Sequence, residues 1–205
     1  MVPQNEIEEA LLVYEDLSYA STSNMIYGTL HLPDKDSYEI EIDLKPCPKF
    51  FPSVKETGGR IPIKLDRHIY PITGSCCFTT RAQSQILLKT KVKSLLMFLD
   101  LVVVPYFENN SFYEIHNCYF GDEYPHDESG ILHGYRDILK IEDRAIIERT
   151  IANTIANSRF REHQLCYCGS GRKLRKCTHK RHIQNLRNLY LVDKDVLKSD
   201  LKLLS

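Results

Sequence analysis

Residues 25–44, MIYGTLHLPDKDSYEIEIDL, decide the fold of the first half of the chain. Toward the end of this stretch acidic residues alternate with four apolar ones, Tyr38, Ile40, Ile42 and Leu44. Such alternation is typical of a strand with one buried face, because successive side chains of a strand point to opposite faces. The turn-forming residues PDKD (33–36) come just before it, so the stretch predicts a β-hairpin.

Other segments around this hairpin have helical or loop patterns. Four prolines and the Gly58-Gly59 pair make residues 45–62 mainly an extended loop, with IPIKL (61–65) as a candidate third strand. Apolar residues at helical intervals predict the helices. These are expected at residues 6–18, at 88–102 with Pro105 as terminator, at 130–140, at 141–158, and around Ile183, Leu186 and Leu189.

The composition is that of a folded protein with one ordinary domain and a small appendage. The chain has 205 residues, 42% of them hydrophobic and 26% charged. Its first residues lack the pattern of a signal peptide, and its longest apolar run, Leu95 to Pro105, is too short to cross a membrane. We therefore expect a cytoplasmic protein without membrane insertion, in which the seven cysteines serve metal binding or catalysis rather than disulfides.

Charge is unevenly distributed along the chain, although the formal net charge is zero. Residues 159–182 hold eight Lys or Arg and one acidic residue, Glu162, so this segment carries 8 − 1 = +7. The remainder carries −7, partly in GDEYPHDES (121–129). The basic segment is either a site of contact with an anionic surface or a solvated face.

Three cysteines lie within this basic segment, in CYCGSGRKLRKCTHK (166–180). A zinc ion would relieve the mutual repulsion of Cys166, Cys168 and Cys177 if a fourth nitrogen or sulfur completed a tetrahedron. Gly169 and Gly171 allow the sharp turn that such a site requires. The alternative is a set of free, reduced cysteines on a basic loop.

This segment resembles the SEC-C module, a small bacterial zinc motif. The motif reads Cys-x-Cys-Gly-Ser-Gly, a basic stretch, and a third cysteine directly followed by the fourth ligand. Thr178 occupies that last position here, so His179 is the expected substitute and His182 the alternative. The resemblance implies one structural zinc ion held by Cys166, Cys168, Cys177 and His179.

A second candidate centre runs from His68 to Gly-Ser-Cys-Cys-Phe (74–78). The order of helix, hairpin, proline-rich loop, this centre and a long helix resembles the ubiquitin-conjugating enzyme fold, in which a helix precedes a four-stranded meander. The family's centre reads His-Pro-Asn-Ile and then Gly-x-Ile-Cys-Leu. The resemblance implies that Cys77 is the catalytic cysteine, with Cys76 as its competitor, and that His68 anchors the loop.

The departures from the family pattern concern the oxyanion. Ile69-Tyr70 replaces the family's Pro-Asn pair, so Ser75, Thr73 or a backbone amide would have to supply the missing donor. Such departures suit divergent bacterial relatives in anti-phage operons, including CBASS systems beside cGAS-like nucleotidyltransferases.

Together these features predict an α+β protein with three parts: a ubiquitin-conjugating-like domain (1–125), a helical connector (126–160) and a SEC-C zinc module with a closing helix (161–205). The expected activity is acyl transfer through a thioester on Cys77. Its partner would be a protein with a reactive C-terminus, either ubiquitin-like or a cGAS-like nucleotidyltransferase.

Three alternatives stay open. In the first, the protein is a catalytically silent scaffold whose basic zinc tail recruits a protein or nucleic acid, nucleic acid being the less favoured partner. In the second, it is a cysteine hydrolase that uses Cys77 and His68. In the third, Cys77 is only a small buried hydrophobe.

Overall fold

The alternating stretch forms β3, one of the two inner strands of a four-stranded antiparallel sheet, and is a strand as predicted. The sheet is a meander in the order β1-β2-β3-β4, and the predicted hairpin joins β2 to β3, with Ile26 opposite Ile42. Its strands are β1 (Leu17–Ala20), β2 (Met25–His31), β3 (Ser37–Asp43) and β4 (Ser53–Glu56). Tyr38, Ile40 and Ile42 are almost completely buried, so one face of the sheet is core.

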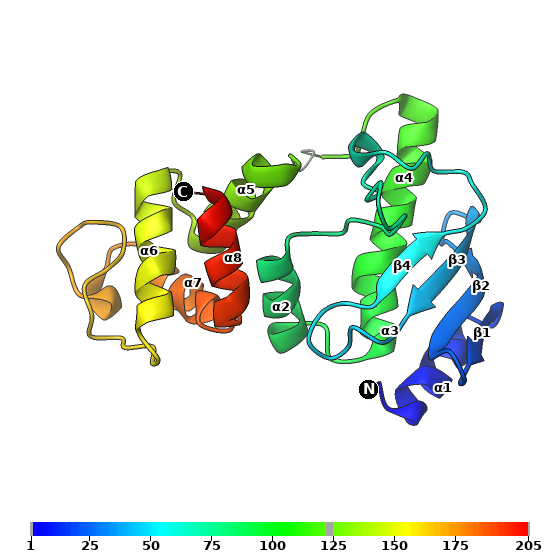
Figure 1. Cartoon of the computed structure of the whole chain (residues 1–205), viewed down its shortest axis with the longest axis horizontal. Coiled ribbons are helices and arrows are strands. Elements are labelled where there is room, and N and C mark those ends of the chain that lie inside the picture. Colours follow the sequence, from blue (N-terminus) through cyan, green and yellow to red (C-terminus); the bar gives the residue numbers. More distant parts are fainter. Residues whose placement is uncertain (1, 122–124, 205) are drawn as a thin grey trace. The chain divides into compact units, whose positions relative to one another are not determined.

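The structure, a computed structural model, describes residues 2–121 and 125–204. Contacts divide the chain into two units: unit 1 is Met1–Phe78 with Thr90–Glu123, and unit 2 is Thr79–Lys89 with Tyr124–Ser205. Unit 1 contains the sheet (Figure 1). Part of the acidic stretch at 121–129, residues 122–124, lies outside the described residues.

The two edge strands differ from the sequence-based expectation. Helix α1 (Gln4–Val13) ends before Leu17, which lies in β1 opposite Gly28 rather than in the predicted helix. β4 lies inside the proline-rich stretch, where Val54 is fully buried opposite Ile42. IPIKL is not a strand: it leads into the short 3₁₀ helix η1 (Leu65–Arg67).

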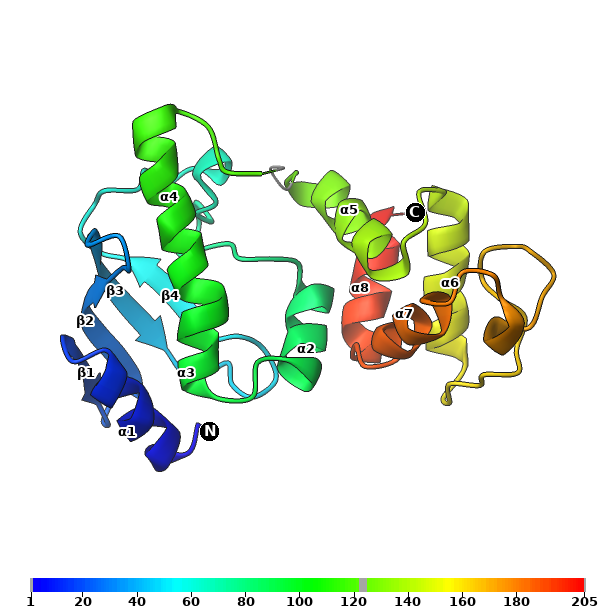
Figure 2. The same ribbon diagram turned by 180° about the vertical axis from the view of Figure 1, so that it is seen from behind.

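A long helical segment crosses the buried face of the sheet in both views (Figures 1 and 2). It consists of α3 (Leu95–Phe98), the π-helical segment η2 (Leu99–Val103) and α4 (Val104–His116). Phe107 of α4 packs on Tyr38 of β3, with their ring centroids 4.6 Å apart.

Pro105 does not terminate this helical segment, contrary to the prediction. Proline disrupts a helix because it lacks an N–H and its ring clashes with the carbonyl four residues earlier. Here the N–H of Val104 bonds to the carbonyl of Leu99, a π-type bond, and Pro105 occupies the first turn of α4. The local widening of the helix therefore accommodates the proline.

Unit 2 is helical. It contains α2 (Arg81–Thr90, up to Lys89), α5 (Asp127–Leu139), α6 (Arg144–Ala156), the 3₁₀ helix η3 (Leu174–Lys176), α7 (His182–Leu189) and α8 (Lys194–Leu204). The predicted connector (126–160) and zinc module (161–205) thus lie together in one unit.

Helix α2 belongs to unit 2, although it interrupts the chain of unit 1. The Gln85 amide explains this: it donates to Asp193 Oδ2 at 3.0 Å and accepts from the Asp193 N–H at 2.8 Å. The helix predicted at 88–102 is broken because Ser94 caps α3, accepting a hydrogen bond from the Met97 N–H.

Among residues 2–121 and 125–204, the structure contains no helix with the length and apolar character needed to cross a bilayer.

Candidate functional sites

The segment from His68 to Cys77 forms a small antiparallel hairpin in unit 1. The Cys77 N–H donates to the His68 carbonyl at 2.7 Å, and the Tyr70 N–H donates to the Ser75 carbonyl at 2.9 Å. Ile69 is paired with Cys76 between these two bonds. The hairpin is attached to β4, because the Cys76 N–H donates to the Val54 carbonyl at 2.7 Å.

This register decides which way the two cysteines point. Neighbouring residues of a strand project to opposite faces, so Ile69 and Cys76 share one face while His68, Tyr70 and Cys77 share the other. Ile69 and Cys76 are 2% and 7% exposed, which identifies theirs as the core face. Cys77 lies on the outer face and is half-buried.

Tyr70 is the side-chain partner of the Cys77 sulfur. The thiol donates to the Tyr70 hydroxyl oxygen, with 3.1 Å between Sγ and Oη. Burial raises the pKa of Cys77 above its ordinary value, and the hydrogen bond with Tyr70 acts in the opposite direction. The Cys77 residue is thus partly exposed, and its sulfur is mainly a thiol at neutral pH.

Cys76 is a poor nucleophile by comparison. Burial raises the pKa of Cys76 to about 12, and the side chain points into the core. Of the two candidates weighed from the sequence, the structure makes Cys77 the accessible one.

His68 holds the hairpin through its backbone. Its carbonyl accepts from the Cys77 N–H and from the Tyr106 hydroxyl, the latter at 3.0 Å. Its φ of 52° is left-handed, which allows the turn from η1 into the hairpin, and its ring packs edge-on against Tyr119 at 5.0 Å. These contacts fix the start of the hairpin between η1 and α4.

The two hydroxyls considered as oxyanion donors bond to each other. Thr73 Oγ1 and Ser75 Oγ are 2.7 Å apart in the turn of the hairpin. Ser75 shares the outer face with Cys77, since both alternate with the buried Cys76.

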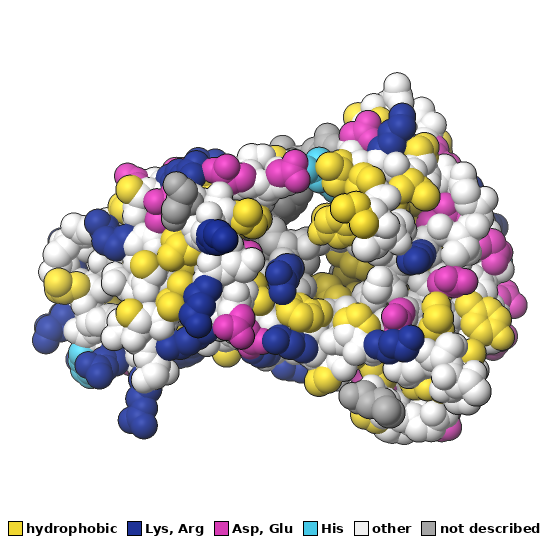
Figure 3. All heavy atoms as spheres, in the orientation of Figure 1, with side chains coloured by type: hydrophobic (Ala, Val, Ile, Leu, Met, Phe, Trp, Pro, Cys, Tyr) yellow, Lys and Arg dark blue, Asp and Glu magenta, His cyan; other side chains and the backbone are white. Residues whose placement is uncertain are grey.

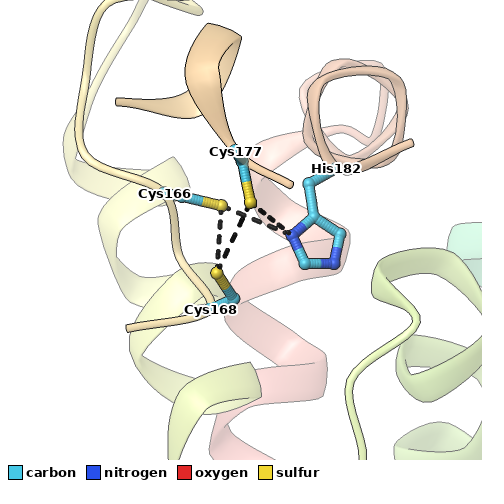
Figure 4. A group of neighbouring side chains, drawn as sticks. All are labelled: Cys166, Cys168, Cys177 and His182. Carbon is cyan, nitrogen blue, oxygen red and sulfur yellow. Dashed lines mark hydrogen bonds between the residues drawn. The ribbon is translucent and has the colours of Figure 1, made fainter. Parts of the chain in front are cut away.

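A metal-ligating cluster lies in unit 2, where Cys166, Cys168, Cys177 and His182 converge (Figure 4). Their donor atoms all lie within 4.8 Å of one another. The Cys168 sulfur is 3.4 Å from that of Cys166 and 3.8 Å from that of Cys177. His182 Nδ1 is 3.4 Å from the Cys166 sulfur and 3.6 Å from the Cys177 sulfur.

These spacings fit a tetrahedral metal ion. Bonds of about 2.3 Å to sulfur and about 2.05 Å to nitrogen give tetrahedral edges of about 3.8 Å between sulfurs and about 3.6 Å between sulfur and nitrogen. The four residues could therefore hold an ion, and the distances are consistent with zinc.

The histidine of this cluster is His182, not the predicted His179. Residues 178–181 form a turn after Cys177, and His182 follows as the first residue of α7, with its side chain buried. The exposed His179 instead stacks its ring on that of His182 at 4.6 Å. The expected spacing was wrong because the sequence does not reveal where the turn ends and α7 begins.

Protonation also favours His182 as a ligand. Burial lowers the pKa of His182, as does the neighbouring His179, so the neutral imidazole that binds metals is the stable form. Among the cysteines, burial acts against the Cys168 thiolate, but hydrogen bonds with Ser170 lower the Cys168 pKa to about 7.

The glycines that follow Cys168 adopt the conformation expected from the sequence. Gly169 has φ +77° and Gly171 has φ +68°, both left-handed, and a Cβ on either would meet no atom within 4 Å. The backbone angle, not lack of space, therefore favours glycine. The Cys166 N–H then bonds to the Arg172 carbonyl at 2.8 Å and closes the turn.

Sequence reasoning did not assign Tyr70 to the thiol. The signal was the spacing: in the hairpin, position 70 lies diagonal to 77 on the same face, a distance that a tyrosine side chain can span. That signal is usable only once the register is known.

In comparisons with known proteins, no family profile, no curated protein and no solved structure matches this chain.

Proposed function

We propose that the protein is an acyl carrier and transferase resembling a ubiquitin-conjugating enzyme, with Cys77 as the thioester-forming residue. One observation carries the proposal: the hairpin register presents the Cys77 sulfur on the outer face beside the Tyr70 hydroxyl and directs Cys76 into the core. A buried structural cysteine would need no such arrangement.

The order of elements in unit 1 supports the same proposal. Helix α1 precedes the four-stranded meander, and Cys77 lies in the long segment after β4. This is the order of the ubiquitin-conjugating family that the sequence resembles.

The proposed chemistry consists of two exchanges at a carbonyl carbon. The Cys77 thiolate attacks a partner's C-terminal thioester, a new carbon–sulfur bond forms, and the donor sulfur leaves as a thiolate. A neutral acceptor amine then attacks the same carbon, its nitrogen gives up one proton to solvent as the amide bond forms, and the Cys77 thiolate leaves. The Tyr70 hydroxyl can rotate to donate to the thiolate in both steps, while His68 holds the hairpin.

The partner we propose is a protein with a reactive C-terminal carboxyl, either ubiquitin-like or a cGAS-like nucleotidyltransferase, in an anti-phage setting in the bacterial cytoplasm. An activating enzyme, or the partner's own activated terminus, would supply the thioester.

We further propose that the cluster in unit 2 holds one structural zinc ion, as in a SEC-C module. Four protein donors, three of them soft thiolates, suit zinc and leave no position for water or substrate. Cys166, Cys168, Cys177 and His182 would hold the ion, which would supply folding energy rather than catalysis.

The acyl-carrier proposal is tested by intact mass spectrometry after incubation with a peptide thioester. Cys118 is an exposed thiol, so the experiment uses the Cys118→Ala background. We expect one added peptide acyl mass that dithiothreitol removes, that Cys77→Ala abolishes and that the matched control Cys76→Ala retains. Lysine added afterwards should receive the acyl group.

Each contrary result identifies an alternative. An adduct that persists in Cys77→Ala would refute the assignment of the nucleophile. Release of free peptide acid without a lysine conjugate would indicate a cysteine hydrolase.

The second candidate is a catalytically silent binding module. The raised pKa of Cys77 favours it, since a thiol protonated at neutral pH reacts slowly. It predicts that no adduct forms and that Cys77→Ala leaves the biological function of the protein unchanged.

A further inference from the structure

The basic segment of unit 2 is an unneutralised positive surface. All eight of its Lys and Arg side chains are exposed: Arg159, Arg161, Arg172, Lys173, Arg175, Lys176, Lys180 and Arg181. The segment's one acidic residue, Glu162, is 2.8 Å from Arg187, outside the segment, and thus neutralises none of them. Within the described ranges, none of the eight forms an ion pair.

The metal cluster and the backbone hold these charges together. Cys166, Cys168 and Cys177 bracket Arg172–Lys176, so the ligands fix both ends of that stretch. The Leu174 N–H donates to the Gln164 carbonyl at 2.8 Å, and the Arg175 N–H donates to the Glu162 carbonyl at 3.1 Å. Arg172–Lys176 therefore lie beside residues 162–166. Figure 3 shows several Lys and Arg side chains, in dark blue, at this end of unit 2.

A polar cavity of about 300 Å³ opens next to this surface. Its polar lining comes from Thr150, Asn153 and Thr154 of α6, from Asn157 directly after that helix, and from Gln164. The remaining lining residues are Leu165, Tyr167, Leu186 and Tyr190. Gln164 thus belongs to the cavity and to the basic segment at once. The cavity is at the small end of the range for ligand pockets and is large enough for a group the size of a nucleobase.

Two amides in this lining are free to bind a ligand. In the part of the chain that the structure describes, the side chains of Asn153 and Gln164 make no hydrogen bond. Amide side chains can donate and accept together, which is the capacity used to recognise the edge of an unpaired base.

We propose that this end of unit 2 binds single-stranded nucleic acid. The basic segment neutralises consecutive phosphates, and the cavity takes one unpaired base, with Asn153 and Gln164 at its edge. This activity goes beyond acyl transfer and depends on residues of unit 2 alone.

Charge by itself would fit an acidic protein or a nucleic acid equally well. The cavity favours nucleic acid, because an acidic peptide would use the cations alone, whereas an unpaired base could also enter the cavity and form hydrogen bonds along its edge. A duplex keeps its bases stacked and could use only the basic surface.

The test is fluorescence anisotropy on the full zinc-loaded chain with a labelled single-stranded 12-mer. Each phosphate contact contributes about −0.7 to the slope of log affinity against log salt, so four contacts would give a slope of about −3. Replacing Arg172, Lys173, Arg175 and Lys176 with Ala should weaken binding more than tenfold and flatten this slope. Metal analysis must show that this variant keeps its zinc.

Gln164→Leu tests the cavity, because it removes an amide while keeping the size and the charge of the segment. It should weaken single-strand binding about three- to tenfold and leave the salt slope unchanged, and Asn153→Leu should do the same. The matched control is Lys202→Ala, which removes an exposed cation of α8 outside the basic segment. Lys202→Ala should change the affinity for the single-stranded oligonucleotide little.

Two outcomes would overturn the proposal. If polyglutamate of equal charge displaces the oligonucleotide as well as unlabelled oligonucleotide does, the surface serves an acidic protein. If duplex binds as tightly as single strand and Gln164→Leu has no effect, the cavity does not accept a base.

Discussion

The Tyr70 hydroxyl contacts the sulfur of Cys77, with 3.1 Å between Oη and Sγ. Replacing Tyr70 with Phe removes that hydroxyl and little else. A hydrogen bond to a charged group contributes about 1.5–3 kcal/mol, and a partly exposed one contributes less. Since 1.36 kcal/mol corresponds to one pKa unit, loss of this hydrogen bond should raise the pKa of Cys77 by about one unit or less. We expect Tyr70→Phe to lower the alkylation rate of Cys77 about three- to tenfold at pH 7.5, measured with iodoacetamide in the Cys118→Ala background.

The pH dependence has a definite sign. The thiolate is the reactive form, and burial raises the pKa of Cys77, so alkylation should still be increasing at pH 9, where an ordinary thiol with a pKa near 8.5 is levelling off. Tyr70→Phe should shift the profile to still higher pH. A profile that levels off below pH 8 in the unmodified protein would contradict this account of the site.

At the metal cluster, His182 and His179 provide a matched pair of substitutions three residues apart. His182→Ala removes a donor at 3.4 Å and 3.6 Å from two sulfurs, whereas His179→Ala removes an exposed ring that stacks on it. We expect His182→Ala to weaken zinc binding more than 100-fold and His179→Ala to weaken it less than tenfold, in competition titrations with a chromogenic chelator. If His179→Ala weakened zinc binding more than His182→Ala, the fourth ligand would be His179, as the sequence predicts.

Helix caps provide a test at the scale of single elements. Asp143 precedes α6, and its carboxylate accepts from the Ile146 N–H at 3.0 Å. Asp143→Ala should lower the free energy of unfolding by about 1 kcal/mol, since it leaves an orphan donor in the first turn. Asp143→Asn keeps a hydrogen-bond acceptor, so it should lower the free energy of unfolding by only a few tenths of a kcal/mol. Urea denaturation measures both changes. Equal losses in the two variants would mean that the cap contributes through its charge alone.

Elements with a local signal were predictable, and elements fixed by distant contacts were not. The alternation around Ile40 predicts β3 because burial on one face is a local pattern. β1 and β4 could not be predicted, because four-residue strands are too short to show the alternation of buried and exposed residues, and Leu17 also fits the apolar face of a helix. A proline inside a helical pattern predicts a helix end at Pro105, because the sequence does not show that a π-type bond from Val104 precedes it.

The candidate sites follow the same rule. Cys166, Cys168, Cys177 and their glycine turn are close in sequence, so spacing alone brought them together, and the histidine beyond the turn was the uncertain ligand. Cys77 was separable from Cys76 only by the register of a hairpin whose bonds run to Val54 and His68. The cavity beside Gln164 is lined by α6 and by the basic segment, which are apart in the sequence, so no local pattern predicts it.

At the scale of the whole molecule, the metal is expected to stabilise one unit and not the other. Structural zinc contributes about 10–16 kcal/mol in small zinc-finger peptides, comparable to the whole stability of a domain. Chelation should therefore speed hydrogen exchange at the amides of Cys166 and Leu174, which bond to Arg172 and Gln164, by at least 100-fold. The amide of Cys77, bonded to His68 in unit 1, should keep its rate. Equal acceleration in both units would show that they unfold together.

The two proposed activities use residues of different units, so their losses should be separable. Cys77→Ala removes one sulfur from unit 1 and leaves the eight cations of the basic segment in place. It should abolish the thioester adduct while changing oligonucleotide affinity less than twofold. The fourfold alanine variant at Arg172–Lys176 should weaken oligonucleotide binding and keep the thioester adduct, because acyl transfer from a small peptide thioester needs no phosphate contact. Mass spectrometry and anisotropy on the same preparations measure both effects. If either variant abolished both activities, acyl transfer and nucleic-acid binding would share a site, and the separate roles assigned to the hairpin and to the zinc-held basic surface would be wrong.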